Sequence, residues 1–302
     1  MAGSSRSWAE GVLRLLNRMN SFHTQGSSKP VCKQFCVGGQ AVGVVQPRLL
    51  PLLRGYPEVF QMTNGHVELS DHLRTFEQRS TAMEQVLRDW RERGLFNCLN
   101  KWRNEEFPVM SRFCDPPLMN IERAAVAGLF GVKSYGVHVN GFVRHEDGRL
   151  SMWIGRRTPQ KETYPGRLDN LVAGGISAGL GVKETLVKEC EEEACIPESI
   201  AQNARPGGTI SYTYEDDAGI FPECQFVYDL EVPADFRPEV GDGEVLEFYL
   251  WSLEQVKELL AGSEFKPNCA MVVLDFVIRH GLLHADNERH YHQLVEGLHR
   301  EL

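Results

Sequence analysis

The sequence contains no run of about eighteen apolar residues, so it predicts no transmembrane helix. Basic residues are not in excess: the formal net charge of the 302-residue chain is −9, which argues against a general nucleic-acid-binding protein. The eight cysteines include no Cys-x-x-Cys pair, and no Cys/His cluster has the spacing of a zinc site. Small buried thiols in a reducing compartment are the simplest interpretation, which favours a cytoplasmic location.

The most distinctive segment begins at Gly174 and Gly175 and continues into an acidic helix with Glu189, Glu192 and Glu193. At about 100° per residue, these three glutamates lie within about a third of a turn of one another. Carboxylate oxygens on one helical face are the ligands that hard divalent cations prefer, although a solvated acidic surface is the alternative. The two glycines permit a tight turn and a close approach to a ligand.

The segment resembles the Nudix box, whose pattern is Gly-x5-Glu-x7-Arg-Glu-U-x-Glu-Glu-x-Gly-U, where U is aliphatic. Gly174 aligns with the first glycine, Glu189 with the glutamate after the arginine, and Glu192 and Glu193 with the acidic pair. The resemblance implies that these glutamates bind Mg²⁺, with Mn²⁺ as a substitute, and help to activate a water that attacks a diphosphate. One of them could act as the base instead of a direct ligand.

Three positions depart from the family pattern. Leu180, Lys188 and Cys195 stand where the family has glutamate, arginine and glycine. In the family, the first glutamate and the arginine support the metal-binding helix. Glu184 lies four residues before Lys188, the favourable orientation for a helical ion pair, so we expect this pair to provide the missing support.

Segments outside the box resemble a Nudix subgroup that carries an N-terminal domain of undefined role. The subgroup is related to the Nudix half of certain thiamine pyrophosphokinase fusions. The matching segments are residues 12–20, 102–105, 161–170 and 265–269. This resemblance implies an α/β Nudix-type α/β/α sandwich with a mixed sheet, preceded by a small α+β domain. It also implies metabolite repair, with thiamine diphosphate or its oxidised or damaged forms as the substrate.

The N-terminal part predicts a small α+β domain over residues 1–120, which ends near the tripeptide at 115–117, Asp-Pro-Pro. Its predicted elements are a helix at 8–20, a strand or hairpin at 36–45, a short helix at 49–54 and a helix at 81–93, in which Thr81 and Glu84 form a capping box. Residues 7–19 are amphipathic and contain arginines, so a mitochondrial presequence is the alternative to a packed helix. Arg103 and Glu105 could reach the neighbouring domain, or form surface ion pairs.

The Nudix domain is expected at residues 121–284, followed by a helical tail at 285–302. Strands are predicted at 134–144, 150–156, 208–214, 225–232 and 245–251, and Asp147-Gly148 is a hairpin signal between the first two. Helices are predicted at 253–260 and 270–280, the second capped by Asn268. This alternation fits a sheet that lies between helices.

Several residues near the box are candidates for substrate binding. Arg156, Arg157 and Lys161 could bind phosphate oxygens, or be ordinary surface residues. Asp169 and Asn170 could orient a ligand or stabilise a turn. Other candidates are Glu244 or Glu247 to complete the metal site, and Tyr164, Tyr212, Tyr214 or Phe221 to stack on an aromatic ring.

We therefore expect a Mg²⁺-dependent diphosphatase that takes a small-molecule diphosphate and neither nucleic acid nor membrane as its partner. A Nudix hydrolase of nucleotide-type diphosphates and a non-catalytic metabolite-binding protein are the alternatives. An isomerase that uses Glu223 and Cys224 is disfavoured, because adjacent side chains on a strand face opposite ways. The sequence makes no prediction of oligomeric state.

Overall fold

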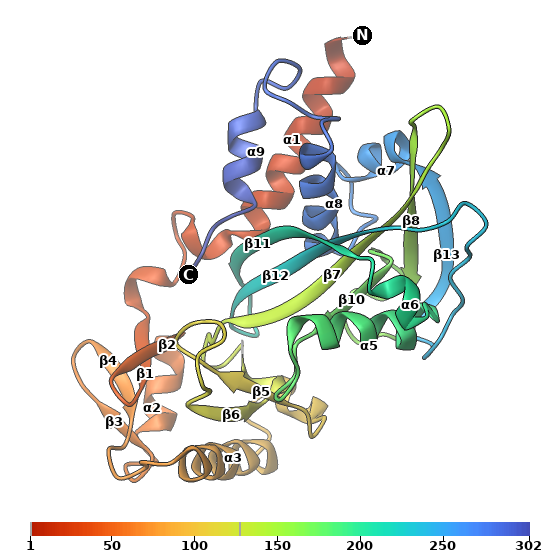
Figure 1. Ribbon diagram of the computed structural model, residues 1–302. Coiled ribbons are helices and arrows are strands. Elements are labelled where there is room, and N and C mark those ends of the chain that lie inside the picture. Colours follow the sequence, from red (N-terminus) through yellow and green to blue (C-terminus); the bar gives the residue numbers. More distant parts are fainter. Residues whose placement is uncertain (1, 127) are drawn as a thin grey trace.

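The computed structural model, shown in Figure 1, describes residues 2–126 and 128–302. Its buried apolar residues form three clusters, one in the N-terminal half and one on each face of the sheet in the second half. No helix in these two ranges has both the length and the apolar content needed to cross a bilayer.

The N-terminal half is built on a four-stranded sheet with the strand order β2-β1-β4-β3. The predicted hairpin at 36–45 is confirmed as β1 and β2, which pair antiparallel. The elements of this half are β1 (Lys33–Val37), β2 (Gln40–Val45), β3 (Phe60–Met62), β4 (His66–Leu69), β5 (Glu106–Val109), β6 (Met119–Glu122), α2 (Leu50–Leu53), α3 (Phe76–Glu92), α4 (Arg123–Val126) and the short 3-10 helices η1 (Ser21–His23), η2 (Lys29–Val31), η3 (Pro47–Leu49) and η4 (Asn97–Lys101).

Helix α3 begins earlier than predicted. Its capping box is formed by Thr75 and Gln78, and Thr81 lies inside the helix. Thr75 has extended backbone angles, and its side chain accepts a hydrogen bond from the Gln78 amide at 3.2 Å. The same Thr-x-x-(Glu/Gln) spacing occurs twice in this stretch, and only the first copy stands at the change in backbone conformation.

The predicted boundary at residue 120 is wrong, because it falls inside β6. Strands β5 and β6 pair antiparallel, so the Asp-Pro-Pro tripeptide at 115–117 joins two paired strands and is not a linker between domains. Phe130 and Val132 are buried in the same hydrophobic cluster as the first sheet. The core of the N-terminal half therefore extends to the start of the next strand.

The second half is an α/β/α sandwich. Its mixed sheet has the order β11-β12-β7-β8-β13, with β10 paired to β7 and β9 paired to β8. Helix α5 covers one face, and α8 lies on the other (Figure 1). The bounds are β7 (Ser134–Arg144), β8 (Leu150–Arg157), β9 (Leu168–Asp169), β10 (Val172–Gly175), β11 (Arg205–Glu215), β12 (Ile220–Glu231), β13 (Val245–Ser252), α5 (Val182–Ala194), α6 (Glu198–Ala201), α7 (Leu253–Leu259), α8 (Pro267–Arg279) and α9 (Tyr291–Gly297). The five predicted strands are confirmed.

The predicted cap of α8 is wrong. The helix begins at Pro267 after Lys266, which makes no side-chain cap hydrogen bond, and Asn268 lies within the first turn. Proline suits this position because its fixed φ matches the helix and its missing N–H would have no partner there.

Helix α1 (Ala2–Met19) packs in the second half, in the hydrophobic cluster on the α8 face of the sheet, although it precedes the N-terminal sheet in the sequence. Val12 and Leu16 are buried in the cluster that contains the apolar side chains of α8. Trp8 donates its indole N–H to the Lys257 carbonyl at 2.8 Å, and Asn20 donates to the Gly297 carbonyl at 2.9 Å. The prediction of a packed helix is confirmed, and a division that assigns residues 1–120 to one domain separates α1 from its packing partners.

Candidate functional site

Strand β10 brings the glycine pair against the acidic helix α5. In the sheet, Gly174 pairs with Val137 on β7, and the side chain of Glu189 occupies the space beside its α-carbon. A Cβ on Gly175 would lie 2.9 Å from the ring of Phe107, which comes from the N-terminal half. The two glycines therefore make room for a carboxylate and for the interface between the halves.

Helix α5 begins and ends as its sequence requires. Glu184 accepts the Gly181 amide at 2.8 Å at the start of the helix. Cys195 ends the helix with φ of 49°, in the left-handed conformation that glycine takes in the family pattern. The expected ion pair between Glu184 and Lys188 is absent, because Glu184 is used as a cap and Lys188 contacts Glu192 at 2.7 Å and Glu189 at 3.4 Å.

The three box glutamates have different environments. Glu193 is buried and accepts the Ala173 amide at 3.0 Å. The side chain of Glu189 is 17% exposed, whereas that of Glu192 is 49% exposed and pairs with Lys188. Among the described residues, no three acidic, histidine or cysteine side chains are gathered closely enough to hold a metal ion. The expected cage of three carboxylates is thus not assembled in this conformation.

The electrostatics of the two inner glutamates fit a cation. Burial raises the pKa of Glu193 well above its usual range, and the nearby charges of Asp169, Glu189 and Glu244 raise it further. Burial is also the main cause of the raised pKa of Glu189. A bound Mg²⁺ would offset both effects by neutralising the clustered charge, and carboxylates are suitable ligands for it.

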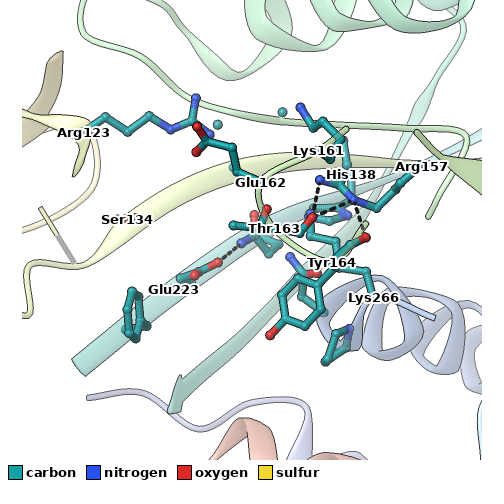
Figure 2. Close-up of a pocket in the computed structure, with 18 of the residues that line it drawn as sticks. Arg123, Ser134, His138, Arg157, Lys161, Glu162, Thr163, Tyr164, Glu223 and Lys266 are labelled. Carbon is teal, nitrogen blue, oxygen red and sulfur yellow. Dashed lines mark hydrogen bonds between the residues drawn. The ribbon is translucent and has the colours of Figure 1, made fainter. Parts of the chain in front are cut away.

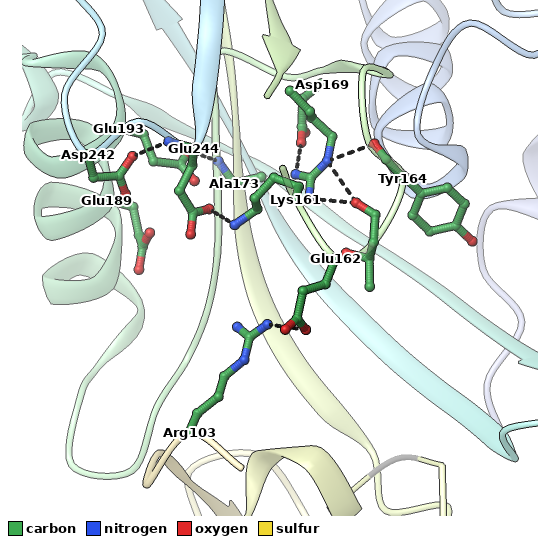
Figure 3. Close-up of polar contacts among 12 residues, drawn as sticks. Arg103, Lys161, Glu162, Tyr164, Asp169, Ala173, Glu189, Glu193, Asp242 and Glu244 are labelled. Carbon is green, nitrogen blue, oxygen red and sulfur yellow. Dashed lines mark hydrogen bonds and ion pairs between the residues drawn. The ribbon is translucent and has the colours of Figure 1, made fainter. Parts of the chain in front are cut away.

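Glu244 lies beside the inner glutamates, and Glu247 does not. Figure 3 shows Glu244 between Glu193 and Lys161, with which it forms an ion pair. Glu247 instead accepts a hydrogen bond from the Tyr249 hydroxyl. Of the two late-strand glutamates considered from the sequence, only Glu244 is positioned to complete the site.

A cavity of about 620 Å³ lies next to this acidic corner and is lined by both halves of the chain (Figure 2). Ala173, Gly174 and Gly175 form part of its wall, and Glu244 marks its junction with the acidic corner. Its cationic lining residues are Lys101, Arg103, Arg123, Arg157, Lys161 and Lys266, and its carboxylates are Glu162, Glu223 and Glu244. This excess of positive charge suits an anionic ligand.

Two of the predicted phosphate-binding residues serve the structure instead. Arg156 donates to the Gly166 carbonyl at 2.9 Å and to the Tyr249 hydroxyl at 3.1 Å, and it is not part of the cavity wall. Arg157 is buried, and it donates to Asp169 at 2.7 Å and to the Thr163 carbonyl at 2.9 Å. Its donors hold the loop after β8 in place. The third predicted cation, Lys161, lines the cavity, and its ammonium group pairs with the side chain of Glu244.

Asp169 and Asn170 lie behind the cavity wall. Burial opposes ionisation of Asp169, but the charges of Lys266 and Arg157 hold its pKa well below the usual range. Asn170 contacts the Nδ1 atom of His138 at 2.7 Å. Burial lowers the pKa of His138 to about 4, so this cavity residue is neutral at physiological pH. The predicted ligand-orienting role is therefore replaced by a supporting one.

The far end of the cavity is aromatic and carries one half-buried carboxylate, that of Glu223. Glu223 accepts hydrogen bonds from the Tyr212 hydroxyl at 2.6 Å and from Gln225 at 2.8 Å. The rings of Tyr214 and Phe221 stack with their centroids 4.7 Å apart. All four aromatic candidates, Tyr164, Tyr212, Tyr214 and Phe221, line the cavity, and so does Glu223, whereas its neighbour Cys224 does not.

Sequence reasoning found only part of the contribution of the N-terminal half, because it named Arg103 and Glu105 but neither Lys101 nor Arg123. Lys101 and Arg103 contact Glu162, both at 3.3 Å. Glu105 accepts a hydrogen bond from Ser177, which lies just after the glycine pair. The interdomain reach considered for Arg103 and Glu105 is thus confirmed, while Arg123 carried no recognisable signal.

Comparisons with known proteins agree with this architecture. Residues 134–269 match the NUDIX domain, and residues 11–134 match a domain of unknown function (DUF4743). Nudix hydrolase 24, chloroplastic, of Arabidopsis thaliana is 40% identical over 256 residues, which cover 84% of this chain and 69% of that protein. Nudix hydrolase 20, chloroplastic, of the same plant is 39% identical, over 92% of this chain and 75% of the relative. The crystal structure of DR0079 from Deinococcus radiodurans aligns with a TM-score of 0.41 and 21% identity, over 56% of this chain and 97% of that one.

Proposed function

The chain belongs to the Nudix hydrolase family, and on this premise we propose that it cleaves the diphosphate of thiamine diphosphate, or of an oxidised or damaged analogue. The products are a monophosphate and inorganic phosphate. The observation that carries the proposal is the cavity itself. One end adjoins the carboxylates of Glu189 and Glu193, which are suited to a metal-bound diphosphate, and the other combines aromatic rings with the half-buried carboxylate of Glu223.

Glu189, Glu192 and Glu193 are the proposed metal ligands, and one of them serves as the base. Mg²⁺ held there would polarise the phosphoryl group and lower the pKa of its bound water, and Mn²⁺ could substitute. Glu193 is already oriented by the Ala173 amide, and Glu189 by the space over Gly174. Glu192 pairs with Lys188 at 2.7 Å, and it would have to give up this contact to bind the metal.

The aromatic end of the cavity supports the choice of substrate. The thiazolium ring of thiamine is flat and carries a permanent positive charge. Aromatic faces attract such a cation, and the stacked pair of Tyr214 and Phe221 offers one. Glu223 supplies an opposing negative charge in the same region, held by Tyr212 and Gln225. A neutral nucleobase would use the rings but would bring no positive charge to Glu223.

The test is a mass-spectrometric assay of phosphate release with Mg²⁺. The panel contains thiamine diphosphate, its oxidised forms, ADP-ribose and a nucleoside triphosphate. We expect turnover of the thiamine compounds, and its loss by at least about a hundredfold in Glu192→Gln. Glu191→Gln, on an exposed neighbouring position of α5, is the matched control and keeps activity. Faster cleavage of nucleotides would reject the substrate, and binding without any product would reject catalysis.

We also propose a cytoplasmic location, supported by cysteines that are all present as free thiols. The mitochondrion is the alternative, and microscopy of the tagged full chain distinguishes the two. A mitochondrial signal would reject this assignment and leave the proposed chemistry intact.

A further inference from the structure

The N-terminal half supplies half of the cationic side chains of the cavity. Lys101 ends η4, Arg103 follows in the next loop, and Arg123 stands at the junction of β6 and α4. The side chains of these three cations are 38–47% exposed. In the second half, Arg157 and Lys161 pair with Asp169 and Glu244, and their side chains are only 9% and 20% exposed. The wall formed by the N-terminal half therefore offers more accessible positive charge than these two residues do.

Arg123 is held in place by contacts that cross the interface. Its guanidinium donates to Glu105 at 2.7 Å, and Glu105 accepts from Ser177 at 2.7 Å. The same guanidinium lies over the ring of Phe107, 5.2 Å from its centroid. Because Phe107 packs against Gly175, these contacts fix Arg123 relative to the glycine turn. A preorganised arginine of this kind binds an oxyanion with little further loss of conformational freedom.

Lys101 and Arg103 converge on one carboxylate. Both cations lie 3.3 Å from Glu162, which stands in the loop after β8 and also lines the cavity. Figure 3 shows the contact between Arg103 and Glu162. The three side chains are 43–47% exposed, so water screens the interaction and the ion pair is weak. A phosphate group presents the same kind of acceptor oxygens with a larger charge, and it would compete well for these two donors.

We propose that Lys101, Arg103 and Arg123 form an anion subsite that binds a phosphate group of the ligand, with Glu162 as the counter-ion that the phosphate displaces. The N-terminal half is then a part of the binding site and not an independent module. The assignment of this phosphate to a diphosphate substrate rests on the proposed function, whereas the subsite itself does not depend on hydrolysis.

The test is isothermal titration calorimetry of the full chain with inorganic diphosphate in a metal-chelating buffer. Lys101→Gln/Arg103→Gln should weaken binding at least about tenfold, since two charge-assisted contacts are lost. Arg144→Gln/Arg149→Gln removes the same charge from two exposed ion pairs at the hairpin between β7 and β8, outside the cavity lining, and should change affinity less than about twofold. Glu162→Gln should tighten binding severalfold, because the competing carboxylate is gone.

The outcomes separate the two proposals. Equal affinities for wild type and Lys101→Gln/Arg103→Gln, or no binding of diphosphate by the wild type, would overturn the subsite. The diphosphate affinity of Arg123→Gln tests the third residue of the subsite and should also fall. Circular dichroism verifies that each variant is folded. Glu192→Gln should retain diphosphate binding in this buffer even though it loses hydrolysis. A loss of hydrolysis can therefore be distinguished from a loss of phosphate binding at the subsite.

Discussion

The Oε1 atom of Glu189 lies 2.6 Å from the point where a Cβ on residue 174 would lie. Substitution of Gly174 by alanine must therefore move this carboxylate, because the other neighbours of that point are also atoms of Glu189. A glutamate side chain can rotate away at small cost to stability, so the main effect falls on the site. The relationship explains the glycine without invoking a positive φ, which Gly174 does not have.

We expect Gly174→Ala to raise the Mg²⁺ concentration needed for half-maximal activity by at least about tenfold, while the melting temperature changes little. Metal titrations of initial rate, with thermal unfolding in parallel, provide the measurement. Gly65→Ala is the control, because open space surrounds that glycine and its φ is not positive. An unchanged metal requirement would show that Glu189 has no part in binding the ion.

Arg157→Gln is expected to lower the free energy of unfolding by about 3 kcal/mol, because it removes the ion-pair partner of buried Asp169 and leaves Lys266 to offset its charge alone. Denaturant unfolding measures this loss. The double variant Arg157→Gln/Asp169→Asn should be less destabilised than the sum of the two single variants, since the carboxylate that lost its partner is also removed. If Arg157→Gln instead retains stability and loses only affinity for phosphate, the guanidinium is a substrate ligand after all.

Leu16→Ala is expected to cost about 3 kcal/mol of folding free energy, because the side chain is buried between α1 and the C-terminal helices. Asn17→Ala, one residue further along the same helix and exposed, is the control and should cost less than about 0.5 kcal/mol. Equilibrium unfolding in urea compares the two. Equal stabilities of the two variants would mean that the packing of α1 does not stabilise the second half.

Asp229 predicts an acid-sensitive contribution to stability. Burial alone would raise its pKa, but hydrogen bonds from Arg279 and His280, at 2.9 Å and 3.0 Å, outweigh that effect and lower the pKa to about 2. Since the pKa in the unfolded chain is about 3.9, the shift corresponds to a contribution of about 3 kcal/mol, which is present above that pH. It is lost as the pH falls from about 4 to about 2. Asp229→Asn should abolish this part of the pH dependence of unfolding; a slope identical to wild type would contradict the assignment.

Local signals in the sequence were sufficient for most of the second half. The hairpin at Asp147-Gly148 contains a turn in which Gly148 has φ of 81°. The Asp-Gly pair predicts this turn because glycine adopts a positive φ easily. The capping box of α7 at Ser252 is equally local. Local signals also predicted the acidic helix and the alignment of its glutamates with the Nudix box. They did not predict that Glu184 would cap the helix instead of pairing with Lys188, because this depends on the position of the Gly181 amide.

The remaining features depend on contacts between residues far apart in the chain. Arg157 resembles a surface cation in sequence, and only the fold brings Asp169 and the Thr163 carbonyl to it in a buried place. Arg123 gives no signal because its role requires Glu105, Ser177 and the ring of Phe107 together. Sequence motifs and hydrophobic periodicity could therefore not predict that residues of the N-terminal half form a wall of the cavity.

The packing of α1 against α8 and α9 has a consequence for biosynthesis. The N-terminal half has its own buried cluster, so we expect it to close while the ribosome is still translating the second half. Helix α1 packs against β11, α8 and α9, all of which are translated long after its Val12 and Leu16. The nascent chain thus exposes an amphipathic segment while the residues between are synthesised, and chaperones that bind such segments are expected to hold it until these partners emerge.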